Sequence, residues 1–161
     1  ENNLIMKKLI LLLLFIPILS FGQIKKVDES AKPVVVGQAK NFTVVIATMN
    51  KIAGDPDYYF VTFDNIKYQT ITDVKSFGFL DVEGAFDYLY SAVAAAAKAG
   101  KKEIDFDLKD GRLSVDIVKA LGVVNVQFRW IENTVLSYSG YMTPKQYAKL
   151  FAKKYDKKDW K

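Results

Sequence analysis

The chain has 161 residues and a formal net charge of +5, and half of its residues are apolar while a quarter are charged. This balance is typical of one globular domain and not of a disordered chain. The chain contains no cysteine and no histidine, which excludes disulfides, thiolate nucleophiles, cysteine-ligated metals and the Ser-His-Asp triad. Carboxylates, lysines, tyrosines and hydroxyls remain for chemistry, and no metal site or cofactor is predicted.

The N-terminal residues have the three-part pattern of a secretory signal peptide. Two lysines precede an apolar stretch at 9–21, and Ser20 and Gly22 are small residues placed for cleavage after Gly22. A helix that spans a bilayer needs about 20 apolar residues, more than this stretch offers. We therefore predict a signal peptide at 1–22, with Met6 as the true start. The mature protein is expected in the periplasm or the medium, without a transmembrane segment.

The mature chain is predicted to form one domain with two short extensions. Residues 23–40 mix charges with Pro33 and are expected to form a flexible leader, in which Val34–Val36 could form an edge strand. A single α+β domain is expected at 41–155, and a basic tail at 156–161.

Four strands and a helix are predicted in the first half of this domain. Alternating and β-branched apolar residues favour strands at 42–49, 58–63, 66–72 and 74–80. Asp81 is placed to cap a helix. The apolar stripe of this helix includes Phe86, Leu89 and Tyr90 at helical spacing, and Gly100 suits its C-terminal end.

The second half repeats this order, beginning with a hairpin at 103–117. The dipeptide Asp110-Gly111 is a strong signal for a tight turn, in which Gly111 would need a positive φ. Strands at 123–131 and 135–141 follow, because apolar and polar residues alternate there.

A last helix is predicted from its start signals. Thr143 and Gln146 have the spacing of a capping box around a proline at the first helical position. Tyr147, Leu150 and Phe151 would form the buried stripe, with Tyr155 one turn further along the same helix.

The element order predicts an α+β fold, an antiparallel sheet with two helices packed on one face. A tandem (ββββα)2 arrangement sharing one sheet is the more specific form of this prediction. Its basis is a faint repeat at a spacing of 61 residues, which matches Phe86, Leu89 and Tyr90 to Tyr147, Leu150 and Phe151.

Three carboxylates on one face of a predicted strand are the first candidate site: Glu103, Asp105 and Asp107. Alternation places neighbouring members about 6.6–7 Å apart. This spacing fits the carboxyl pair of an inverting glycosidase or a calcium ion with further oxygen ligands. The favoured interpretation is a solvated strand face paired with nearby Lys109, Arg112 or Lys119, since sheets with one wet face are common.

The basic C-terminus is the second candidate site. Residues 145–161 carry seven lysines and two aspartates, interleaved with aromatic residues. Such a helix end could contact an anionic membrane surface or a polyanion. Nucleic acid is not expected for an exported protein with two arginines. The alternative is a solvated helix face, where lysines near the C-terminal end suit the helix dipole. The residues of this candidate are Tyr147, Lys149, Lys153, Lys154, Tyr155 and Trp160.

These observations favour a small exported protein that binds another envelope protein, or itself, without catalysis. The alternatives are a binder of small ligands or carbohydrates and a carboxylate-based hydrolase using Glu103–Asp107. An enzyme needs two carboxylates that converge in a cleft, one with a raised pKa. A ligand binder needs a pocket of several hundred Å³. A protein-interaction module needs an exposed apolar patch or a bare strand edge.

Overall fold

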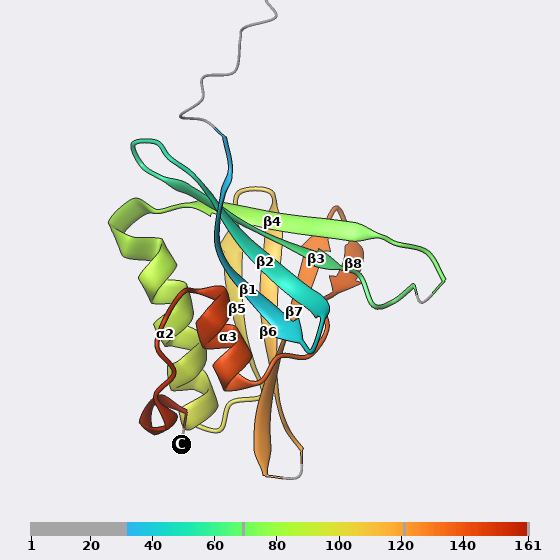
Figure 1. The fold of residues 1–161 in the computed structure, drawn as a ribbon, viewed down its shortest axis with the longest axis vertical. Helices are drawn as coiled ribbons and strands as arrows, with labels where there is room; N and C mark the ends of the chain where they lie inside the picture. Colours follow the sequence, from blue (N-terminus) through green and yellow to red (C-terminus); the bar gives the residue numbers. More distant parts are fainter. Residues whose placement is uncertain (1–31, 69, 121, 161) are drawn as a thin grey trace, which may run out of the picture.

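The computed structural model describes residues 32–68, 70–120 and 122–160. Its elements (Figure 1) are β1 (Val34–Asn41), β2 (Val44–Ile52), β3 (Tyr58–Asp64), β4 (Val74–Leu80), η2 (Val82–Gly84), α2 (Ala85–Lys98), β5 (Glu103–Leu108), β6 (Gly111–Ala120), β7 (Val123–Glu132), β8 (Val135–Tyr138), α3 (Pro144–Leu150) and η3 (Lys157–Asp159). The predicted signal peptide and the leader at 23–31 lie outside the described residues. Within the described ranges, no helix is both long and apolar enough to cross a bilayer.

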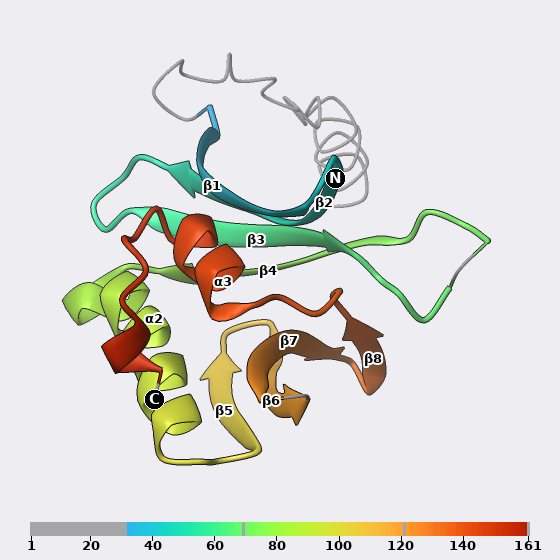
Figure 2. The ribbon, with the colours of Figure 1, turned by 60° about the horizontal axis from the view of Figure 1, so that its bottom comes forward.

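The eight strands form two four-stranded antiparallel sheets, ordered β1-β2-β3-β4 and β5-β6-β7-β8. Figure 2 shows the first sheet on one side, with both helices and the second sheet on the other. The predicted α+β class is confirmed. Four strands precede each helix, as predicted, but in the first half one of them is β1 and the predicted strand at 66–72 is absent. The sequence analysis expected the two halves to share one sheet. Each half instead forms its own sheet, because its four strands pair only with one another.

Strand β1 occupies the last seven residues of the predicted flexible leader, 34–40. Residues 34–40 pair with β2 as an edge strand, which was the alternative interpretation of Val34–Val36. Helix α3 packs on this strand at Gly37, where an added Cβ would lie 2.2 Å from the Lys149 carbonyl oxygen. The backbone of β1 therefore belongs to the packed domain.

The predicted strand at 66–72 is wrong. The described residues of 65–73 lie in a loop, closed where the Asn65 N–H donates to the Asp73 carbonyl oxygen over 2.9 Å. Ile66, Tyr68 and Ile71 are exposed in this loop. The alternation of apolar residues therefore does not mark a half-buried strand here.

The helix ends follow local signals, with two differences from the prediction. Gly100 has a φ of 70° just after α2, and the Lys101 N–H donates to the Ala96 carbonyl oxygen, as in a Schellman motif. Helix α2 begins at Ala85 and not directly after Asp81, although the Asp81 carboxylate accepts a 2.9 Å bond from the Phe86 N–H.

Helix α3 begins as predicted but is shorter than expected. Thr143 and Gln146 form the capping box in both directions. A left-handed residue, Ala152, follows the last turn, and the Lys153 N–H donates to the Ala148 carbonyl oxygen. This Schellman motif ends the helix, so Tyr155 does not lie on it.

Aromatic side chains from both halves meet in one core. Tyr147 of α3 is fully buried, and its ring lies 5.7 Å from Tyr90 of α2 and 6.1 Å from Phe128 of β7. Phe77 of β4 contacts Phe128 edge-on at 5.2 Å. The two sheets and both helices are thus joined through rings, whose burial is a large part of the packing energy.

Gly111 is required for a reason other than the predicted positive φ. It is the first residue of β6, and the glycines with positive φ in the described ranges are at 84, 100 and 122. An added Cβ at Gly111 would lie 2.3 Å from the Ile131 carbonyl oxygen and 2.8 Å from the Trp130 ring. Real Cβ atoms do not approach a backbone oxygen so closely.

We predict that Gly111→Ala and Gly111→Asn each lower the free energy of unfolding by about 3 kcal/mol, because β6 must move away from β7. Urea denaturation measures this change. A positive φ would instead be tolerated by asparagine, so a harmless Gly111→Asn would contradict the contact. Arg112→Ala is the control, since Arg112 is exposed and a surface ion pair such as Arg112–Asp107 contributes little to stability.

Candidate functional site

The three carboxylates on β5 are exposed, and each has a partner on another strand of the second sheet, β6 or β7. Glu103 pairs with Arg129 at 2.8 Å, and Asp107 pairs with Arg112 at 2.9 Å. The Asp105 carboxylate accepts a hydrogen bond from the Ser114 hydroxyl. The strand thus holds them on one face, as predicted, in separate pairwise contacts across the second sheet.

Asp116 is an acidic residue of this face that the sequence analysis missed. It lies directly opposite Glu103 across the β5–β6 ladder, so the register of the predicted hairpin could have identified it. Desolvation raises the pKa of Asp116 above its ordinary value, while the guanidinium of Arg129 acts in the opposite direction. Arg129 lies 3.2 Å from Asp116 and 2.8 Å from Glu103. It therefore pairs with one oxygen of each of these two carboxylates.

The six residues predicted at the basic C-terminus do not form one surface. Tyr147 and Trp160 are buried in the core, with their rings 5.6 Å apart. The Lys153 ammonium pairs with Asp87 of α2 and lies over the Phe86 ring. The other three, Lys149, Lys154 and Tyr155, are exposed. The predicted basic tail includes Trp160, so it is in part a packed segment.

Several exposed apolar side chains lie at one end of the first sheet, which we call the apolar end. Ala47 of β2 pairs with Phe63 of β3, so the start of β2 lies beside the end of β3. The β1–β2 turn and the 65–73 loop therefore leave the sheet at the same end, as Figures 1 and 2 show. The apolar end consists of Phe42, Val44, Val45, Ile66, Tyr68, Ile71 and Val74.

Phe42 is the most unusual residue of the apolar end. It stands with Thr43 in the two-residue turn between β1 and β2, with a φ of 52°. Its side chain is 96% exposed. Glycine, asparagine or aspartate ordinarily fills such a turn position, because a side chain of this size is strained there. An aromatic residue between two β-branched runs was the signal in the sequence that could have identified it.

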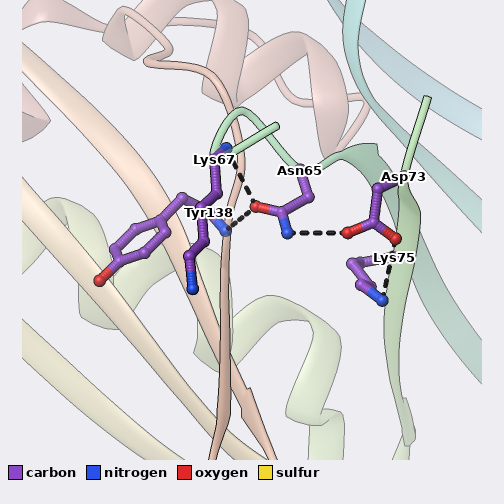
Figure 3. A network of polar contacts seen from close by, with 5 residues as sticks. All are labelled: Asn65, Lys67, Asp73, Lys75 and Tyr138. Carbon is purple, nitrogen blue, oxygen red and sulfur yellow. Dashed lines mark hydrogen bonds and ion pairs between the residues drawn. The ribbon is translucent and has the colours of Figure 1, made fainter. Parts of the chain in front are cut away.

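The 65–73 loop is held in place by the side chain of Asn65 (Figure 3). Asn65 is 3% exposed, and its Nδ2 donates to an Asp73 carboxylate oxygen over 2.9 Å. Its Oδ1 accepts from the backbone N–H groups of Tyr138, at 3.0 Å, and Lys67, at 3.3 Å. The Ile66 N–H also donates to the Tyr138 carbonyl oxygen. The loop is therefore fastened to β8 of the second sheet.

The Asp73 carboxylate links this network to the ammonium group of Lys75. Its pKa is lowered from the ordinary value, first by the hydrogen bond from Asn65 and then by Lys75, whose ammonium lies 3.0 Å away. The ionised form of Asp73 is thus the form that supports the loop.

Across the part of the chain that the structure describes, no group of three or more acidic side chains is arranged to hold a metal ion. Comparisons with family models, curated proteins and solved structures found no match to this chain. A function must therefore be argued from the surfaces themselves.

We predict that Asp73→Asn lowers stability at neutral pH and that this difference disappears in acid. Because the folded protein lowers the pKa of Asp73, the stabilisation is full above the pKa of the unfolded chain. It is lost as the pH falls through the lower, folded value. Denaturant unfolding of the wild type and the variant across this pH range measures the difference.

Asp64→Asn is the matched control, since Asp64 is an exposed carboxylate at the end of β3. Its effect should be small at every pH. If Asp73→Asn lowers the free energy of unfolding as much in acid as at neutral pH, the loop does not depend on the charge of Asp73.

Proposed function

We propose that this protein is a non-catalytic binding protein of the bacterial envelope, and that a partner protein docks on the apolar end. The observation that carries the proposal is Phe42, an almost fully exposed aromatic side chain on a backbone with positive φ. An exposed apolar patch is what an interaction module requires.

The cost of Phe42 to the isolated protein supports this proposal. A left-handed backbone costs about 1–2 kcal/mol for a residue with a side chain, and glycine would avoid this cost. The exposed ring recovers none of it through burial. Residues that break a local rule in this way are concentrated at functional sites. Aromatic side chains also supply much of the energy at protein interfaces.

The surroundings of Phe42 support a protein partner with a concave apolar surface. Phe42 projects from a hairpin, and the 65–73 loop beside it is anchored by Asn65. Two exposed lysines, Lys40 and Lys67, flank the apolar side chains. A preformed projection loses little entropy on binding. The partner is therefore proposed to have an apolar pocket with an acidic rim.

The test compares Phe42→Gly with the wild type as bait, using Gln23–Lys161 and envelope extract of the host at low and high salt. Phe42→Gly is expected to leave the free energy of unfolding unchanged or raise it by about 1 kcal/mol, because the turn is relieved of strain. The same change is expected to weaken partner binding at least tenfold, as loss of an interface anchor does. Binding is then measured with the purified partner by calorimetry.

Val82→Ser is the control, because Val82 is an exposed apolar residue outside the apolar end. It should leave binding unchanged. If Phe42→Gly binds as the wild type does, or if the wild type captures nothing, the proposal is wrong. Sedimentation distinguishes a second copy of this chain from a different envelope protein as the partner.

A further inference from the structure

A large groove lies away from the apolar end, and its lining shares no residue with it. The C-terminal end of α2, the end of β6 and the start of β7 form its walls, together with the segment before α3 and the C-terminal residues. These segments gather at the lower end of the molecule in Figure 1. The groove has a volume of about 1150 Å³, enough for a small organic ligand.

Five lysines line this groove: Lys98, Lys101, Lys102, Lys119 and Lys157. The Lys98 ammonium donates to the Lys158 carbonyl oxygen over 3.0 Å. The ammonium groups of the other four make no ion pair or side-chain hydrogen bond with the described residues. Their charge is therefore available to a ligand.

The negative groups at the groove are two carboxylates that share one arginine, fewer charges than the five lysines carry. The lining carboxylates are Glu103 and Asp116, and both are paired with Arg129. The last carbonyl groups of α2, at Ala95, Ala96 and Ala97, accept bonds from the N–H groups of residues 99–101. These three carbonyl oxygens therefore already have hydrogen-bond donors.

Exposed apolar side chains lie between these charges. Four of them line the groove. Val118 lies on β6 and Val123 on β7, while Tyr141 precedes α3 and Tyr155 follows it. An inorganic anion would leave these side chains in water. A neutral apolar molecule would leave the lysines without a partner. The lining thus suits a ligand that carries both properties.

We infer that the groove binds a small amphiphilic anion, an apolar body that ends in a carboxylate or a phosphate. The lysines recognise the anionic group, and the valines and tyrosines cover the apolar body. This ligand site goes beyond the proposed partner surface and does not depend on it, because no residue is common to the two.

Isothermal titration calorimetry with four probes tests this inference: dodecanoate and dodecyl phosphate, both below their critical micelle concentrations, and dodecanol and inorganic phosphate. At least one of the two amphiphilic anions is expected to bind the full mature chain with one site. Dodecanol and inorganic phosphate are expected to bind at least tenfold more weakly. The preference between the two anions identifies the head group.

Three variants locate the site. Lys119→Gln and Lys157→Gln each remove one ammonium group from a different wall and are expected to weaken the preferred anion about tenfold. Val118→Ser is expected to weaken the amphiphile without changing inorganic phosphate. Lys109→Gln is the control, because this lysine lies in the β5–β6 turn outside the groove lining, and it should change nothing.

Several results would overturn the inference. If neither anion binds, or if dodecanol binds as tightly as the anions do, the lysines do not recognise an anionic group. Equal binding of inorganic phosphate removes the apolar part. Unchanged affinity in the lysine variants, with folding verified by circular dichroism, moves the site elsewhere, including to the apolar end. The Phe42→Gly variant tests for binding at the apolar end. If the amphiphile binds in the groove, this variant should bind it as tightly as the wild type does.

Discussion

The burial of Tyr147 is the constraint on which the rest of the fold depends. Its ring contacts Tyr90, Phe128, Phe151 and Trp160, so one side chain joins α2, β7, α3 and the C-terminal segment. The hydroxyl donates to the Leu89 carbonyl oxygen over 3.3 Å, and burial raises the pKa of Tyr147 well above its ordinary value. With no cysteine in the chain, packing of this kind replaces disulfide crosslinks.

The contacts between the two helices agree with the faint repeat in the sequence. At a spacing of 61 residues, Phe86 corresponds to Tyr147 and Tyr90 corresponds to Phe151. Phe86 lies 5.2 Å from Phe151, and the counterpart of this contact, between Tyr147 and Tyr90, is present at 5.7 Å. Reciprocal contacts are what a two-fold relation between two similar units produces. The units therefore meet through equivalent helix faces, while each sheet pairs only within its own unit.

Features that depend on neighbouring residues could be predicted from the sequence. The capping box at Thr143 and the stop at Gly100 are examples, because the atoms that form them lie within one helical turn. Features that depend on distant residues could not. Asn65 bonds to Tyr138, 73 residues away, so the 65–73 loop was mistaken for a strand. The sequence identified Gly111 as essential. It did not show the reason, which is the close carbonyl oxygen of Ile131 on the neighbouring strand. The groove likewise unites segments from five parts of the chain.

Two departures from local rules occur at the same end of the molecule. Phe42 takes a backbone conformation that suits glycine, and an alternating β-like sequence at 66–72 forms an exposed loop. The turn of the paired β1–β2 hairpin holds Phe42, and the buried amide of Asn65 holds the 65–73 loop. Both contacts keep apolar side chains exposed to water. A partner that covers them would recover this cost, which is why the apolar end, and not the paired carboxylates of β5, is the surface on which to seek function.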